Sequence, residues 1–246
     1  MAITTPEPEA AIAVRVGRRG VTDLGGTEPW RPRILATAGP AARVALVQSR
    51  ASLLGGDEVS LEVVVDEGCA LELVELGATV AHHVRGGAPA RVSAVVRLGR
   101  GARLVWLAEP LIAAAGCRVA RSVRVELAAG AVVLLRETLV LGRAGEEPGR
   151  ASSHTRITLE GRPVVDETLE TRPSWLLRSS VVAGPAGTVD AVTLAGLRDP
   201  SPPPGALQCH EPATLWRGLG AAGAPLAAAG GELARRWLAL LLEHAA

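Results

Sequence analysis

The stretch GCALELVE at residues 68–75 decides the fold, because variants of it recur along the chain at nearly regular intervals. GARLVWLAE follows at residues 101–109 and GAVVLLRE at residues 130–137, and GRPVVDE at residues 161–167 is a weaker fourth copy. The glycines that open these copies lie 33, 29 and 31 residues apart. Repeats of roughly 20–50 residues are typical of stacked architectures, in which one unit covers its apolar face only against the next.

The residues before these glycines complete the repeating unit. EVSLEVVV (58–65), VRVEL (123–127) and RITLE (156–160) alternate with the period of two that a half-buried strand requires. Each unit is thus an alternating strand, a glycine turn, an apolar strand and a closing glutamate. The pattern predicts an all-β protein with a β-helix or β-solenoid-like body and one or two helices. A two-sheet sandwich would give a looser version of the same pattern.

The composition indicates a globular protein and excludes several classes of function. Of the 246 residues, 48% are hydrophobic and 21% are charged. The net charge of +1 gives no electrostatic reason to expect a nucleic-acid partner. All 26 basic residues are arginine, so mechanisms that need a Schiff-base lysine or a P-loop lysine are excluded.

The termini and the cysteines bear on the expected location of the protein. Residues 1–13 lack the basic start and apolar run of a signal peptide, and the apolar stretch at 237–242 is far too short to cross a bilayer. Three widely spaced cysteines do not suggest a disulfide framework. We therefore expect a cytoplasmic protein without a membrane partner.

Changes of composition along the chain predict four regions. We expect an N-terminal segment at residues 1–30, the β-body at 31–197, a Pro/Gly/Ala-rich linker region at 198–231 and an amphipathic helix at 232–246. In the last region, apolar residues such as Trp237 fall on helical spacing opposite charged ones. Such a helix either folds back on the body or docks on a partner, and the sequence leaves both possibilities open.

The closing glutamates are the first candidates for chemistry. Glu75, Glu109, Glu137 and, less clearly, Glu167 occupy equivalent places in successive units, so stacking is expected to put them in a row. They either end each strand in water or line a hydrophilic passage for a cation, since carboxylates are suitable weak ligands for a divalent metal.

Two histidines and an aspartate are further candidates. His82 and His83 are adjacent, so in a strand they point to opposite faces and do not both ligate one metal without a bulge. They are surface residues or second-rank contacts for a passing metal ion. Asp57 follows two glycines, and it either contributes to the same ion route or caps a turn.

Several ordered segments resemble the family of the urease accessory protein UreD, called UreH in some species. SLLGGD at residues 52–57 resembles that family's GGLLGGD signature, and VWLAEPLI at 105–112 is similar to its W-x-P-E/Q-P-x-I segment. RETLVLGR at 136–143 resembles a third segment, and EGRP at 160–163 follows at the right interval. The resemblance spans about residues 31–197, and its motif residues here are Gly55, Gly56, Trp106, Pro110, Gly142 and Arg143.

The resemblance implies a cytoplasmic, non-catalytic chaperone with a β-helical body that helps to assemble the nickel centre of urease. Its implied partners are UreF, the GTPase UreG through UreF, and apo-urease. A polar tunnel is the family's proposed nickel route, which implies that nickel passes transiently and that no cofactor is tightly bound. On this resemblance, Glu109, Glu137 and Asp57 are expected on the ion route or a partner face.

Departures from the family pattern keep two rival hypotheses open. The segment GATVAHHVR at residues 77–85 lacks the family's Lys and Tyr, and alanines at 113–115 replace aromatic residues. One rival is a β-helix carbohydrate enzyme that uses Glu109 and Glu137 as acid and base, although a chain without Tyr or Phe makes a poor sugar-binding groove. The other is a generic interaction scaffold.

Overall fold

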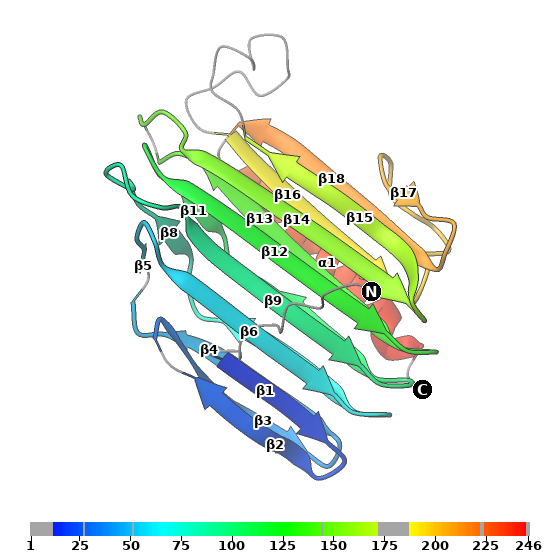
Figure 1. Ribbon diagram of the computed structural model, residues 1–246. Coiled ribbons are helices and arrows are strands. Elements are labelled where there is room, and N and C mark those ends of the chain that lie inside the picture. The colour runs from blue at the N-terminus through cyan, green and yellow to red at the C-terminus, as the bar shows by residue number, and fades with distance from the viewer. Residues whose placement is uncertain are drawn as a thin grey trace, which may run out of the picture.

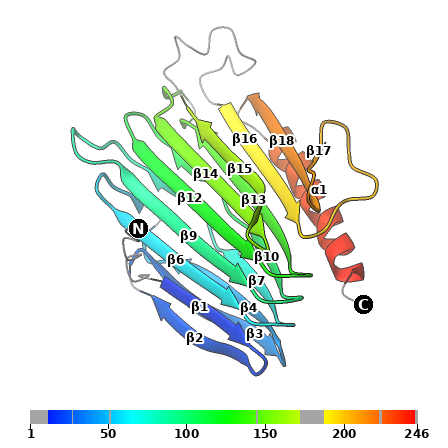
Figure 2. The same ribbon diagram turned by 45° about the vertical axis from the view of Figure 1, so that its right-hand side comes forward.

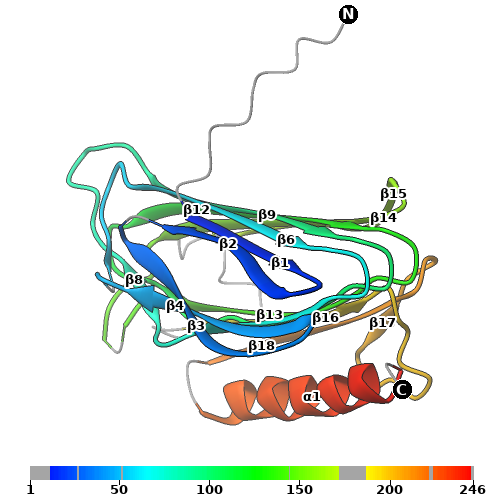
Figure 3. The same ribbon diagram turned by 90° about the horizontal axis from the view of Figure 1, so that it is seen from below.

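A computed structural model describes residues 12–26, 28–50, 52–143, 145–171, 187–221 and 224–244. Two β-sheets face each other as two layers, and one helix lies outside them (Figure 3). Sheet A has the strand order β15-β14-β12-β9-β6-β1-β2, and the main path of sheet B is β17-β18-β16-β13-β10-β7-β4-β3.

The strands of sheet A are β1 (Ile12–Gly17), β2 (Gly20–Gly26), β6 (Glu58–Val65), β9 (Ala90–Leu98), β12 (Arg118–Leu127), β14 (Arg150–Leu159) and β15 (Arg162–Glu170). Those on the main path of sheet B are β3 (Trp30–Ala38), β4 (Ala41–Gln48), β7 (Ala70–Glu75), β10 (Arg103–Leu107), β13 (Val132–Leu141), β16 (Gly187–Ala195), β17 (Leu207–Gln208) and β18 (Ala213–Ala221). Three short strands of sheet B lie off its main path: β5 (Ser52–Leu53), β8 (Thr79–Ala81) and β11 (Leu111–Ala113). Strand β8 pairs with β5 and β11, and β11 also pairs with β13.

Between β4 and β14 the chain winds from one sheet to the other, which confirms the predicted solenoid. Strands β6, β9, β12 and β14 pair in parallel in sheet A (Figure 1), and β4, β7, β10 and β13 do so in sheet B (Figure 2). Successive repeats therefore stack in register, and Leu104 pairs with Leu71 on one side and Val133 on the other. Their apolar side chains fill the space between the layers.

The repeated glycines make the turns from sheet A to sheet B. Gly68, Gly101 and Gly130 have φ angles of 68°, 62° and 70°, a left-handed conformation that the Cβ atom of any other residue disfavours. The turns also stack, because the backbone N–H of Gly68 donates to Arg100 and that of Gly101 donates to Ala129. The repeat seen in the sequence is therefore a repeat of turn geometry.

The weaker fourth copy has a different role. Glu160 and Gly161 have φ angles of 50° and 76°, and two consecutive positive φ values make a tight two-residue hairpin. The chain thus returns as β15, antiparallel to β14, and stays in sheet A. Glu167 consequently belongs to the sheet opposite Glu75 and Glu137.

The structure differs from the predicted regional boundaries. Residues 12–26, expected in an N-terminal segment, form β1 and β2 because the alternating Ile12, Val14 and Val16 are buried. Residues 198–231, expected as a linker region, contain β17, β18 and the start of the helix α1 (Ala224–Glu243). Residues 1–11, 172–186 and 245–246 of the predicted regions lie outside the described residues.

The helix α1 folds back on the body, which was one of the two possibilities left open. It lies along the outer face of sheet B, against β13, β16 and β18 (Figure 3). Trp237 is fully buried there and packs in a cluster with Val192 and Leu194. No helix in the described part of the chain is long and apolar enough to cross a membrane.

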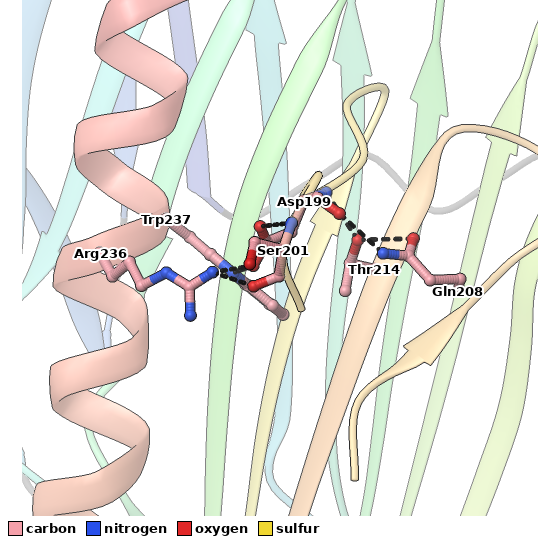
Figure 4. Close-up of polar contacts among 6 residues, drawn as sticks. All are labelled: Asp199, Ser201, Gln208, Thr214, Arg236 and Trp237. Atoms are coloured by element: carbon pink, nitrogen blue, oxygen red, sulfur yellow. Dashed lines mark hydrogen bonds and ion pairs between the residues drawn. The ribbon is translucent and has the colours of Figure 1, made fainter. Parts of the chain in front are cut away.

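A buried aspartate ties α1 to the loop before β17 (Figure 4). Asp199 is 3% exposed, and its Oδ2 accepts hydrogen bonds from Trp237 Nε1 at 2.8 Å and from Arg236 at 2.7 Å. Gln208 donates to the Asp199 backbone carbonyl, while Thr214 accepts from the Asp199 N–H and donates to Gln208. The network leaves none of the Asp199 polar atoms without a partner.

A second buried aspartate acts near the other end of α1. Asp190 on β16 is fully buried and receives two hydrogen bonds from Arg136, at 3.1 and 2.8 Å, and one from Thr138 at 3.0 Å. Arg136 also donates to the carbonyl of Ala227 in α1. A Cβ added at Gly230 would lie 1.9 Å from Asp190 Oδ2, so only glycine permits this close approach of helix and sheet.

Candidate functional site

Several charged side chains project into the largely apolar space between the sheets, among them Glu75, Glu137 and Arg121. Glu75 ends β7 and Glu137 lies on β13, both in sheet B, while Arg121 lies on β12 in sheet A. Neighbouring residues of a strand point to opposite faces, so Arg136 turns outward to α1 while Glu137 turns inward. Arg121 likewise takes the inward place between Val119 and Val123, which are both buried.

Glu75 is a buried carboxylate that accepts two hydrogen bonds. It is 8% exposed, and it accepts hydrogen bonds from Trp106 Nε1 at 2.9 Å and from the Glu109 backbone N–H at 3.1 Å. Burial raises the pKa of Glu75, and the nearby Arg121 guanidinium and these hydrogen bonds only partly oppose the rise. The interior therefore favours a neutral or cation-paired carboxyl group at this place.

Arg121 and Glu137 form an ion pair across the two sheets. Arg121 Nε lies 3.4 Å from Glu137 Oε1, and the two side chains are only 10% and 12% exposed. Thr155 donates to Glu137 Oε2 at 2.8 Å. The Arg121 guanidinium also lies 5.9 Å from the centre of the Trp106 ring, within cation–π range.

Two cavities adjoin this group of charges. The larger, of about 140 Å³, is lined by residues that include Glu137, Glu167 and Arg217. The smaller, of about 20 Å³, is lined by residues that include Glu75 and Glu109. Arg121 and Leu111 are the two residues common to both linings, so they lie where the cavities adjoin. Each cavity is roomy enough for at least one ordered water, which needs about 10–15 Å³.

A second ion pair crosses the larger cavity. Arg217 on β18 donates to Glu167 on β15 through Nε at 2.9 Å, and Arg217 also donates to Thr193 at 3.3 Å. The pair joins the edge strand of sheet A to sheet B. The interior thus presents acids from both sheets, each with an arginine opposite.

The closing glutamates do not form the single row that was expected. Leu107 pairs with Val74 on one side and Arg136 on the other, so the next residue, Ala108 and not Glu109, continues this register toward Glu75 and Glu137. The unit at residues 101–109 holds one residue more between its glycine and its glutamate than its neighbours do. One extra residue turns a side chain to the other face, and Glu109 is exposed.

The remaining predicted site residues lie away from the charged interior. Asp57 Oδ2 accepts a hydrogen bond from the Leu54 N–H at 2.7 Å and pairs with Arg50 at 2.9 Å, so it caps its turn. Half-buried His82 lies 3.3 Å from Ser52 Oγ, and exposed His83 accepts from the Arg85 N–H at 2.7 Å. Among the residues that the structure describes, no three His, Cys, Asp or Glu side chains form a metal-holding group.

The residues of the family-like motifs mainly shape turns and packing. Gly56 has a φ of 88° in the turn before β6, and a Cβ at Gly55 would lie 3.0 Å from Val84. Trp106 is buried beside Glu75, and the Pro110 carbonyl accepts from the Thr79 N–H. Gly142 has a φ of 81°, and Arg143 pairs with Glu146 on the surface.

Arg121, Arg136 and Asp190 were not among the residues expected at the site. A signal for Arg121 exists, because it is the one charged residue among the inward places of β12, which otherwise hold valine or leucine. The partners of Arg121 and Arg136 are 16 and 54 residues away in sequence and on other strands, so no local pattern indicates them.

Replacing Glu75 by Gln should change how stability depends on pH. Between the pKa of Glu75 in the unfolded chain and its raised pKa in the folded protein, the native state holds a proton that the unfolded chain has lost. Stability from this group is therefore lost as the pH rises through that window. In chemical denaturation at several pH values, Glu75→Gln should gain stability relative to the unchanged chain as the pH rises. Glu72→Gln, on the same strand but about half exposed, is the control; equal behaviour of the two variants would contradict the assignment.

The family model and the known proteins that this chain resembles all belong to one family. The family model described as "UreD urease accessory protein" matches residues 9–245. The chain is 38% identical to Urease accessory protein UreD 1 of Streptomyces griseus, over 80% of this chain and 78% of that protein. It is 37% identical to Urease accessory protein UreD of Streptomyces avermitilis, over 67% and 66% of the two chains. It is 33% identical to Urease accessory protein UreD 1 of Saccharopolyspora erythraea, over 80% of each chain.

Proposed function

Because the chain belongs to the family of UreD urease accessory proteins, we propose that it is a non-catalytic, cytoplasmic scaffold in urease maturation. It binds apo-urease and UreF, and through UreF it engages the GTPase UreG. Nickel crosses the body between its two sheets on the way to urease, without a tightly held cofactor.

The observation that supports this proposal is the group of acids inside an apolar body. Glu75 and Glu137 face the interior at one strand level of sheet B, and Glu167 faces the larger cavity from sheet A. Burying charged groups is costly, so a body that only needed stability would fill these places with apolar residues. Carboxylates are suitable weak ligands for a divalent ion that must leave again.

The same geometry does not favour the pair of glutamates on which the alternative enzyme hypothesis rests. Glu109 is exposed and borders the smaller cavity, whereas Glu137 borders the larger one. An acid and base pair would have to flank one bond of one substrate. The two glutamates do not share a cavity in which that is possible.

Replacing Glu137 by Gln should lower nickel incorporation into urease severalfold while leaving the complexes intact. Gln keeps the size of the side chain and an acceptor for Thr155, but it removes the charge that faces the cavity. The measurement is co-purification of the tagged chain with urease subunits and UreF, followed by atomic absorption of nickel in the urease formed. Glu109→Gln should have a smaller effect, because that side chain is exposed.

The control is Glu126→Gln, an exposed carboxylate on the outer face of sheet A that pairs with Arg97. It should leave both assembly and nickel content unchanged. Failure of the unchanged chain to bind urease or UreF would remove the maturation proposal. Normal assembly with unchanged nickel in Glu137→Gln would remove the interior route and leave the scaffold role.

A further inference from the structure

We propose that Arg121 gates the interior, with its guanidinium closing the connection between the two cavities and occupying the place between Glu75 and Glu137 where a divalent cation would be held. This inference rests on the proposed function, since it assigns a control element to the same cation route. It makes Arg121 a positioning and selecting residue that no motif of the chain indicates.

Arg121 lies between the two cavities and separates them. Its side chain comes from sheet A and reaches Glu137 on sheet B, so it spans the gap between the layers. It lines both cavities, and among the described residues the apolar Leu111 is the only other one that does so. The Trp106 ring, which donates to Glu75, lies beside the guanidinium.

The contact between Arg121 and Glu137 is looser than the buried ion pair between Arg136 and Asp190. Arg136 holds Asp190 through two hydrogen bonds at 3.1 and 2.8 Å, the forked geometry of a strong pair. Arg121 reaches Glu137 Oε1 only at 3.4 Å, and that oxygen is buried without a hydrogen-bond partner. Arg136 is therefore held more firmly than Arg121, and an incoming cation can take the place of Arg121 only by compensating the buried Glu137 carboxylate.

The larger cavity offers room for that movement. It adjoins the guanidinium and contains about 140 Å³, with Glu167 on its wall as a second acid. When Arg121 turns into this space, the carboxylates of Glu75 and Glu137, on two strands of sheet B that flank β10, are left without the guanidinium. A buried carboxylate without a cationic partner is costly, so this open state favours an incoming cation.

The replacement of the Arg121 guanidinium by a metal cation also determines which cations can bind. A cation enters only if its attraction to Glu75 and Glu137 exceeds that of the guanidinium it displaces. A divalent ion meets this condition more readily than a monovalent one, because the Coulomb energy scales with charge. By reciprocity, whatever stabilises the closed position of Arg121 weakens cation binding by the same factor.

The test is metal titration of the full chain carrying Arg121→Met. Methionine fills a similar volume without charge, so both carboxylates lose their cation. Isothermal titration with nickel chloride should show binding at least about tenfold tighter than in the unchanged chain. Adding Glu137→Gln to Arg121→Met should abolish the gain, and Arg121→Lys should behave like the unchanged chain.

Arg217→Met is the matched control. Arg217 is also a mostly buried arginine, 20% exposed and paired with Glu167, but it lines only the larger cavity. It should not tighten nickel binding to the same extent. No tightening in Arg121→Met, or equal tightening in Arg217→Met, would overturn the gate.

Loss of folding does not obscure the result. If Arg121→Met melts early in thermal unfolding, the gate requires that nickel raise its melting temperature and that Glu137→Gln in the same chain restore it. A structural role alone would give no nickel-dependent recovery. The titration uses the isolated chain, so its outcome is separate from whether the chain assembles with urease, and either proposal can fail alone.

Discussion

The Trp237→Ala variant is expected to unfold with a free energy about 3–5 kcal/mol lower than that of the unchanged chain. Trp237 is fully buried between α1 and sheet B, in a cluster with Val192 and Leu194. Its Nε1 also donates to Asp199, so truncation leaves a cavity and removes a donor from a buried carboxylate. Equilibrium denaturation in urea, followed by circular dichroism, measures the change.

Leu242→Ala provides the control on the same helix. Leu242 is 59% exposed, so its truncation should change the free energy of unfolding by no more than about 0.5 kcal/mol. Equal stability of Trp237→Ala and the unchanged chain would mean that α1 contributes nothing to the folded body. The expected result instead makes α1 an integral layer of the fold.

The Asp190→Ala variant is expected to lose about 3–5 kcal/mol of stability, because one partner of a buried ion pair is removed and the other remains. Arg136 would keep its charge with a side chain only 18% exposed, and the buried Thr138 would lose its acceptor. The same urea denaturation measures the loss. Replacing Arg136 by Met together with Asp190→Ala should recover part of it, since no unpaired charge then remains.

An exposed ion pair of sheet B gives the comparison. Arg43 and Glu72 lie 3.0 Å apart with side chains about half exposed, so Glu72→Ala should cost less than about 1 kcal/mol. Similar losses in Glu72→Ala and Asp190→Ala would contradict the role given to burial. The difference between the two losses also bears on the interior, because it shows that Arg136 stabilises the fold, whereas Arg121 is assigned to the cation route.

The sequence was sufficient for the architecture because the architecture is a repeat of local geometry. The glycines at 68, 101 and 130 repeat since each turn needs a positive φ, and the strands between them repeat since each buries one face. Stacking then follows, because each unit covers its neighbour. The helix at the end of the chain was predicted from its apolar spacing, although it begins eight residues earlier than expected.

The charged interior was only partly predictable. Glu137 could be singled out because it stands in an apolar strand, and Glu75 because it closes the first copy. The offset of Glu109 was also present in the sequence, as one extra residue after Gly101, but its effect depends on register. The turn of the chain at Gly161 placed Glu167 on the opposite sheet, where it meets Arg217.

The sequence by itself therefore determined the strands and turns of the repeated units and the order in which these units stack, since they follow from backbone conformation and a period of two. It did not indicate β1, β2, β17 and β18, which lie in residues expected as a terminal segment and a linker. Only the tertiary structure decided which charges meet. Arg121 reaches Glu137 across two sheets, and Arg136, the residue before Glu137, turns the opposite way to hold Asp190 under α1. Ion pairs depend on distances between elements far apart in sequence, and GCALELVE with its copies specifies the layers without specifying what lies between them.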